Sequence, residues 1–329
     1  MRGIAALAVV TLHASVIAGL DVRGWSAALA VDFFFCLSGF VVAHAYEERL
    51  RSGALSFQRF MIKRLVRLYP MIFAGAVIGF AAHIYAEHNA PWRDLGRSLL
   101  LIPRLDGWLT YPLNSPMWSL LYELLASVGF ALFLKIAPKA VPWLVLPAGL
   151  ALAFCILRAG HVDTFGIGGP GVLWKGSIRI AYPFILGVML CRHRTRLPRV
   201  PALVAPTLLL AVLLIVSPPF RGVYQALATL IVLPLVVALG AKADVPGRLH
   251  FLGRLSYPLY LVHWGVLIVI EHMLHGLLSP LIIAAAGVVA SCAAAWVALI
   301  AYDEPLRAWL ASRLDGRQPL PAKAAMLSA

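Results

Sequence analysis

The stretch that decides the fold is SPLIIAAAGVVASCAAAWVALIA, residues 279–301, which contains no charged side chain. The hydrocarbon core of a bilayer is crossed by about 20 consecutive apolar residues in helical conformation. Residues 279–301 have that length and that composition. They are therefore predicted to cross a membrane as one helix.

The composition of the whole chain indicates the same environment. Of its 329 residues, 61% are hydrophobic and 13% are charged. An average soluble domain is about half apolar and about a quarter charged. So few charged side chains cannot cover the core of a soluble protein of this size, and most of the outer surface is expected to contact lipid.

Nine further apolar runs resemble the first and are separated by Pro, Gly or charged residues. The ten predicted spans cover residues 3–20, 28–46, 70–87, 116–136, 140–158, 174–191, 201–218, 222–240, 256–274 and 279–301. We expect an all-α, polytopic membrane bundle of about ten transmembrane helices, with one domain over 1–303 and a cytoplasmic, partly disordered tail over 304–329. A cleaved signal peptide is the alternative for the first span, but His13 and the nine spans that follow favour a retained helix.

The formal net charge of +14 has two interpretations. In a soluble chain it suggests nucleic-acid binding, whereas a polytopic membrane protein gathers Lys and Arg on its cytoplasmic side. Alternating the ten spans places 20 of the 28 Lys and Arg residues on one side and seven on the other. The chain is therefore predicted to be a multi-pass protein of the cytoplasmic (inner) membrane with both termini in the cytoplasm, and no nucleic-acid partner is expected.

Several ionisable side chains fall inside the predicted spans, where each costs several kcal/mol without a partner or a function. They are His13, Asp32, Glu123, Arg179 and His263. A bundle with only a structural role does not need this many. The alternative hypothesis is a small proton-coupled transporter or exporter, in which these groups relay protons, although no internal repeat of the kind common in transporters is evident.

Arg2 and His13 are eleven residues apart, which places them on one helical face and about 16 Å apart along the axis. Arg2 would lie at the cytoplasmic surface and hold an anionic group, and His13 would accept or relay a proton within the span. The alternative is a packing histidine beside an arginine that only sets topology. Asp32, near the outer end of its span, either pairs with Arg2 or His13 or caps its helix.

Ser119 and Glu123 share a helical face, and Trp118 is expected at the outer membrane interface. The Glu123 carboxylate either pairs with Arg179 as structure or polarises a histidine. A second stripe, Ser256, Tyr260 and His263, presents hydroxyl and imidazole groups on one face, either toward a site or for hydrogen bonds between helices.

A cationic cluster of Arg59, Lys63, Arg64 and Arg67 precedes the third span. It fits lipid headgroups or the phosphates of a cytoplasmic coenzyme, because arginine offers forked donors to phosphate. No phosphate-binding glycine loop accompanies it. No metal is expected either, because the histidines and acids of residues 271–275 lack the spacing of a ligand set.

Four segments, in order along the chain, resemble the acyltransferase-3 family of integral membrane O-acyltransferases. They are residues 2–13 (RGIAALAVVTLH), 31–40 (VDFFFCLSGF), 64–70 (RLVRLYP) together with Trp118, Ser119 and Glu123, and 256–263 (SYPLYLVH). The resemblance covers nearly the whole chain. Cys36 and Gly265 depart from the residues usual at their positions, and the arginine lies closer to the first residue than is usual, which leaves open a native start upstream of Met1.

The resemblance implies transfer of an acyl group, usually acetyl, from cytoplasmic acyl-CoA to a hydroxyl of a cell-surface or exported carbohydrate. Acyl-CoA would be a co-substrate, and no permanently bound cofactor is implied; the partners would be acyl-CoA, a glycan or lipid-linked sugar, and membrane lipids. A lipid or small metabolite is the alternative acceptor. The residues implied are catalytic His13, Arg2, Glu123 and Asp32, coenzyme-binding Arg2, Arg64 and Arg67, and substrate-binding Trp118, Ser119, Tyr260 and His263.

Overall fold

The structure is a computed structural model that describes residues 1–315 except 23–24, 138, 216–219, 244–246 and 248–249. The described chain is built from helices without a strand. The α-helices are α1 (Arg2–Ile17), α2 (Ala30–Arg51), α3 (Phe57–Glu87), α4 (Trp92–Leu99), α5 (Trp118–Ile136), α6 (Val141–Ala159), α7 (Val172–Arg192), α8 (Val204–Leu214), α9 (Arg221–Leu227), α10 (Leu233–Gly240), α11 (His250–Leu274), α12 (Pro280–Ala298) and α13 (Glu304–Asp315). Short 3-10 helices precede α2 (Ser26–Leu29) and α5 (Ser115–Met117) and follow α7 (Arg194–Arg196).

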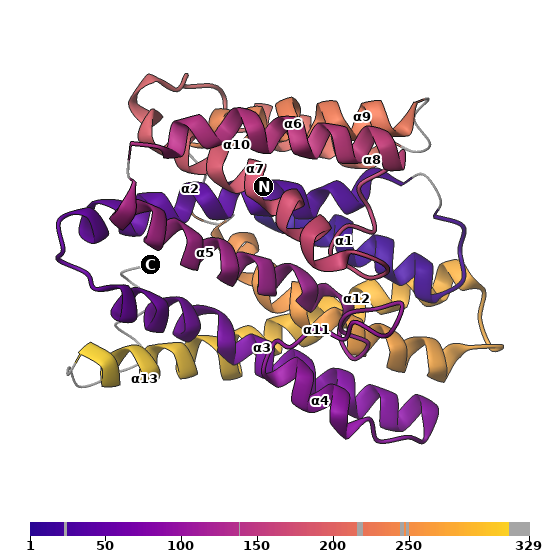
Figure 1. The fold of residues 1–329 in the computed structure, drawn as a ribbon. Helices are drawn as coiled ribbons and strands as arrows, with labels where there is room; N and C mark the ends of the chain where they lie inside the picture. Colours follow the sequence, from indigo (N-terminus) through magenta and orange to yellow (C-terminus); the bar gives the residue numbers. More distant parts are fainter. Residues whose placement is uncertain (23–24, 138, 216–219, 244–246, 248–249, 316–329) are drawn as a thin grey trace.

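The long helices lie side by side in one bundle (Figure 1). Eight helices of the described chain are long and apolar enough to cross a membrane, and α1 and α8 are shorter apolar helices. Together they account for the ten predicted spans, with one composed of α9, the π-helical turn Ala228–Val232 and α10. The prediction of an all-α polytopic bundle is confirmed.

Helix α3 departs most from its predicted boundaries. It begins at Phe57 rather than at residue 70, because Ser56 caps it by accepting a hydrogen bond from the Arg59 backbone N–H at 3.3 Å. Pro70 lies inside the helix, which a membrane bundle tolerates where neighbouring groups satisfy the freed carbonyl. The early start has a functional consequence, since Arg64 and Arg67 are carried on a helix rather than on a loop.

The predicted tail also contains structure. A π-helical turn, Leu299–Asp303, continues α12 into α13, which packs beside α3 (Figure 1). The expectation of disorder falls on residues 316–329, which lie outside the described residues.

Helices α2 and α7 pack closely because a glycine from each faces the backbone of the other. A Cβ on Gly39 would lie 2.0 Å from the Phe184 carbonyl oxygen, and one on Gly187 would lie 2.0 Å from that of Cys36. Small residues permit such close approach between transmembrane helices. The Ser38-Gly39 pair in the sequence is typical of this packing, which fixes α2 along one wall of the site described below.

The outside of the bundle is apolar. On α6 the side chains of Trp143, Leu146, Leu150, Phe154 and Leu157 are all exposed and recur at helical spacing. A contiguous apolar stripe of this kind on a soluble protein would mark an interface. On a helix of membrane-spanning length and composition it forms a surface that faces lipid.

Candidate active site

The two intramembrane histidines lie against each other. His13 on α1 and His263 on α11 are 250 residues apart in sequence, yet His13 Nδ1 and His263 Nε2 are 2.8 Å apart. Their ring centres are 5.1 Å apart and their planes are nearly parallel, with an interplanar angle of 7°, and the Trp264 ring meets His13 edge-on at 5.2 Å. The structure therefore combines two candidates that the sequence placed on separate helices.

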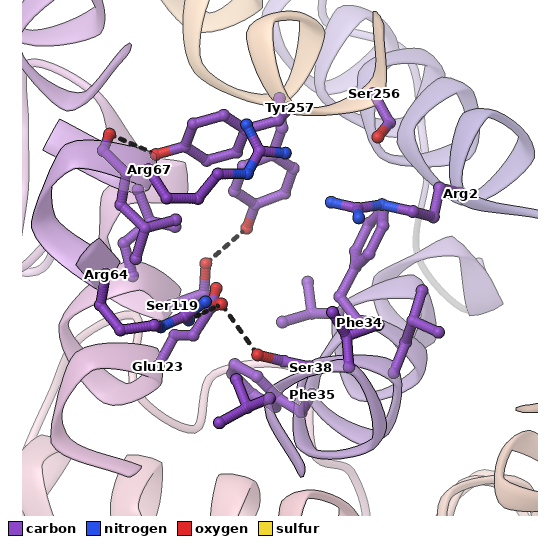
Figure 2. Close-up of a pocket in the computed structure, with 17 residues that line it drawn as sticks. Arg2, Phe34, Phe35, Ser38, Arg64, Arg67, Ser119, Glu123, Ser256 and Tyr257 are labelled. Atoms are coloured by element: carbon purple, nitrogen blue, oxygen red, sulfur yellow. Dashed lines mark hydrogen bonds and ion pairs between the residues drawn. The ribbon is translucent and has the colours of Figure 1, made fainter. Parts of the chain in front are cut away.

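A cavity opens between α1, α2, α3, α5 and α11 (Figure 2). Its polar lining includes the side chains of Arg2, Ser38, Arg64, Arg67, Ser119, Glu123, Ser256, Tyr257 and Tyr260. We call the end of the bundle where Arg2, Arg64 and Arg67 lie the basic end. Neither His13 nor His263 lines the cavity, but Tyr260 does, and its ring lies 6.1 Å from that of His263. Tyr260 thus connects the cavity to the histidine pair.

Two arginines at the cavity have N–H donors that make no hydrogen bond within the described structure. Arg2 Nε and Arg67 Nη1 are buried and have no hydrogen-bond partner among the described residues. In Figure 2 the Arg67 guanidinium lies beside Tyr257, and the Arg2 guanidinium points into the pocket from the opposite side. The Arg67 guanidinium lies 5.4 Å from the centre of the Tyr257 ring, whose hydroxyl donates to the Leu68 carbonyl at 2.5 Å. Buried cationic donors without partners favour an anionic ligand, since leaving them unpaired costs free energy.

The comparisons with known proteins agree with this arrangement. The family model for acyltransferase-3 proteins, described as an acyltransferase domain, matches residues 1–300. The chain belongs to the acyltransferase-3 family. It is similar to the acyltransferase MdmB of Streptomyces mycarofaciens, with 28% identity over 275 residues that cover 73% of this chain and 68% of that protein. It is also similar to protein 2 in the picA locus of Rhizobium radiobacter, with 36% identity over 151 residues that cover 40% of this chain and 78% of that protein. No solved structure matches the chain.

Family membership and the apolar helices establish a multi-pass membrane acyltransferase. Acyl transfer requires a donor and an acceptor, and the site of this acyltransferase-3 protein offers a basic end and a histidine pair. The placement of the remaining predicted residues shows which of them can take part.

Glu123 pairs with Arg64, and neither with Arg179 nor with a histidine, the two alternatives that the sequence left open. Arg64 Nη2 and Glu123 Oε1 are 2.5 Å apart, and the Ser38 hydroxyl donates to the same carboxylate oxygen at 2.8 Å. Arg64 Nε also donates to Ser127 Oγ at 3.2 Å. Arg64 is therefore partly committed within the protein, which distinguishes it from the other two predicted coenzyme-binding arginines.

Asp32 pairs with neither Arg2 nor His13. Its carboxylate accepts two hydrogen bonds from Arg179, at 2.9 and 2.8 Å, and both side chains are buried. Arg179 also donates to the carbonyls of residues 28, 162, 163 and 165. The Asp32 carboxylate thus binds α2 to α7 and to the loop before α7, and in the described structure it does not orient His13.

Trp118 is not at the outer interface. It is 3% exposed and stacks against Arg179, with the guanidinium 5.1 Å from its ring centre. Ser119, its neighbour, lines the cavity and is hydrogen-bonded to the Tyr260 hydroxyl at 2.9 Å. Of the predicted substrate-binding residues, Ser119 and Tyr260 therefore face the cavity, His263 lies behind them, and Trp118 supports the wall.

Three residues of the site were not singled out from the sequence. They are Ser38, which binds Glu123, Tyr257, which stacks with Arg67, and Trp264, which packs on His13. Tyr257 precedes Tyr260 by three residues, a helical spacing that could have indicated it. Ser38 and Trp264 gave no such signal, because each acts on a residue from another helix.

Proposed function

We propose that this acyltransferase moves an acetyl group from cytoplasmic acetyl-CoA to a hydroxyl of a cell-surface or exported carbohydrate. The observation that carries the proposal is the position of the histidine pair behind a cavity whose other end holds the unpaired Arg2 and Arg67 donors. An anionic coenzyme and a proton-transfer group are what acyl transfer from a thioester needs.

The basic end supports coenzyme A as the donor. Its phosphates would supply acceptors to Arg2 and Arg67, which have buried donors available. Arginine suits phosphate because its planar fork can form paired hydrogen bonds. The excess of Lys and Arg on this side of the chain indicates a cytoplasmic location, where acyl-CoA is found. The proposal assigns both termini to the same, cytoplasmic side.

The spacing along α1 relates the two ends of the site. His13 follows Arg2 by eleven residues, or about 16 Å of helix. A coenzyme whose phosphates bind Arg2 and Arg67 would direct its pantetheine arm past Tyr260 toward His13 and His263. The thioester would then reach the only imidazole pair among the described transmembrane residues.

The chemistry assigned to His13 is general base catalysis. The imidazole takes the proton from the acceptor hydroxyl, the hydroxyl oxygen bonds to the thioester carbonyl carbon, and the carbon–sulfur bond breaks. The proton then passes from the imidazole to the departing thiolate, so the products are the acyl ester and free coenzyme A. Transient acylation of the same imidazole is the second route that the site allows, with the acyl group passing from sulfur to nitrogen to oxygen.

The outer connections favour a sugar acceptor. Trp108 and Trp174 are both exposed and line an open depression together with Asp106. Exposed aromatic faces beside a carboxylate suit stacking and hydrogen bonding to a sugar. Tyr111, on the connection between α4 and α5, is buried and has no part in this surface, since its hydroxyl donates to the Leu101 carbonyl at 2.7 Å.

The test uses the full chain reconstituted in liposomes with labelled acetyl-CoA and surface glycan from a host strain. We expect His13→Ala to abolish transfer of label to glycan while coenzyme A binding persists. His275→Ala is the matched control, because His275 is an exposed histidine paired with Glu271. Wild-type transfer by the His13 variant would reject the mechanism.

The acceptor and the function class are tested separately. Mass spectrometry of surface polysaccharide from a deletion strain is expected to show loss of O-acetyl groups. Loss of acetyl from a lipid or metabolite would replace the carbohydrate acceptor. Proton-coupled uptake without consumption of acetyl-CoA would identify a transporter.

A further inference from the structure

We infer that His263 is a positioning residue which holds His13 in the tautomer protonated at Nδ1, so that Nε2 of His13 is the atom that exchanges protons with substrate. The inference rests on the proposed function, because it assigns the acting atom within the same acyl transfer. It follows from two consecutive hydrogen bonds, one from His263 to the Leu259 carbonyl and one between His263 and His13.

The first hydrogen bond fixes His263. Its Nδ1 lies 2.9 Å from the carbonyl oxygen of Leu259, one helical turn earlier on α11. A carbonyl oxygen can only accept, so Nδ1 of His263 carries the proton. In the neutral ring the other nitrogen, Nε2, is then an acceptor.

The second hydrogen bond fixes His13. His263 Nε2 is 2.8 Å from His13 Nδ1, and since Nε2 has no proton, Nδ1 of His13 must donate. The neutral His13 ring therefore keeps its lone pair on Nε2. A charged His263 would reverse these roles, but His263 is fully buried and a charge there would be costly without a counter-ion.

The surroundings of the pair support the neutral form. The aromatic neighbours of the rings are the Trp264 indole on α11 and the Tyr260 phenol, whose hydroxyl is bonded to Ser119 on α5. The predicted carboxylate partners, Asp32 and Glu123, are bonded to arginines elsewhere. Within the described chain, His263 takes the place that a carboxylate occupies in a catalytic triad, where the partner orients the histidine and selects its tautomer.

This arrangement accounts for every proton in the base-catalysed step. Nε2 of His13 takes the hydroxyl proton and the ring becomes an imidazolium, whose charge is shared through the Nδ1–H bond to His263. When the carbon–sulfur bond breaks, the same Nε2 returns that proton to the thiolate. His263 keeps its own proton throughout, held by the Leu259 carbonyl.

Two amide substitutions of His263 separate positioning from packing. In His263→Gln the amide reaches the position of Nε2 and can still accept from His13, whereas in His263→Asn it reaches only the position of Nδ1. General base catalysis contributes about 10²–10⁴-fold. We expect the Asn variant to lose about 10²-fold in kcat with the KM for acetyl-CoA nearly unchanged, and the Gln variant to stay within about tenfold of wild type, since the acceptor that aligns the base is kept.

The outcomes distinguish the possible failures. An inactive wild-type protein would reject the proposed function and not the tautomer. If the Asn, Gln and wild-type forms were equally active in one assay, the role of His263 would be overturned. The same would follow if both variants bound coenzyme A normally but lost activity equally.

A direct measurement needs no variant to be active. Nitrogen-15 NMR of the histidine-labelled wild-type protein, with the His13 signals assigned by their absence in His13→Gln, reports which ring nitrogen carries the proton. We expect His13 to be neutral and protonated at Nδ1. Protonation at Nε2, or a charged ring in the resting protein, would overturn the inference.

Discussion

Arg179 is a buried cationic group and Arg2 and Arg67 are half-buried ones, and they differ in how fully their hydrogen-bond donors are used. Arg179 binds both oxygens of Asp32 and four backbone carbonyls. Arg2 and Arg67 each retain a buried nitrogen with no partner among the described residues. The Arg179 guanidinium is saturated, since it is fully used in contacts within the fold, whereas those of Arg2 and Arg67 are unsaturated and keep donors that the proposed function assigns to a ligand.

Arg64 lies between these two cases. It lines the same cavity as Arg2 and Arg67, yet it already binds Glu123 and Ser127. The Glu123 carboxylate is held in turn by Ser38. The difference between Arg64 and the other two arginines shows that lining a cavity does not by itself identify a ligand-binding arginine. The number of N–H donors without a partner also matters.

The largest expected effect is on the saturated arginine. Arg179→Leu leaves the Asp32 carboxylate buried without its partner, and breaking a buried ion pair costs about 3–5 kcal/mol. We expect a large fall in melting temperature, measured on detergent-purified protein, with little folded protein recovered. Arg194→Leu, at an exposed position on the connection after α7, is the control. If Arg179→Leu had the melting temperature of the wild type, the proposed difference between saturated and unsaturated arginines would be wrong.

The unsaturated arginines are expected to affect binding rather than folding. Arg2→Met and Arg67→Met remove charge-assisted hydrogen bonds to the donor, each contributing about 1.5–3 kcal/mol, or roughly a 10- to 100-fold rise in KM for acetyl-CoA. Methionine keeps an apolar stem against Tyr257, so the melting temperature should stay near that of wild type. Arg59→Met, exposed on the same helix as Arg67, is the matched control. An unchanged KM would reject the coenzyme assignment.

Ser38→Ala tests how firmly Glu123, the partner of Arg64, is held in place. It removes one hydrogen bond to Glu123 and leaves the bond from Arg64, so we expect a loss of about 1 kcal/mol in stability. The measurement is the melting temperature together with kcat/KM. Ser127→Ala, which removes a 3.2 Å bond to Arg64 on the other side of the pair, is the comparison. No change in either variant would show that Glu123 is held by Arg64 alone.

The smallest effect is expected at an exposed ion pair. Arg254 and Glu304 form two hydrogen bonds, at 2.7 and 2.6 Å, but their side chains are 41% and 31% exposed. Exposed pairs contribute at most about 1 kcal/mol. Arg254→Ala should therefore leave both the melting temperature and the KM for acetyl-CoA almost unchanged. A loss comparable to that of Arg179→Leu would mean that donor saturation does not determine which arginines stabilise the fold.

The sequence predicted the spans because hydrophobic length is a local property. It placed the first span at 3–20 and the last at 279–301, close to α1 and α12. It missed more than three turns at the start of α3, because residues 57–69 are too basic to be predicted as part of a span. In the folded chain two of those basic residues, Arg64 and Arg67, line the cavity at the basic end of the bundle.

The sequence predicted which residues belong to the candidate site but not which of them contact one another. Helical spacing related Arg2 to His13 and Tyr260 to His263, since each pair shares a helix. It could not show that Asp32 faces Arg179 or that Glu123 faces Arg64, because those contacts depend on which faces of different helices meet. Charge balance alone allowed several partners for each acid.

The separation of 250 residues between His13 and His263 also sets the order of events during synthesis. At about 5–20 residues per second, a ribosome needs roughly 10–50 s to add α11 after α1 has emerged. Throughout that interval the His263 ring is absent, so under the proposed mechanism a nascent chain stalled before α11 has an incomplete and inactive site. The proposed mechanism therefore predicts an enzyme that becomes competent only when nearly all of its helices have entered the membrane.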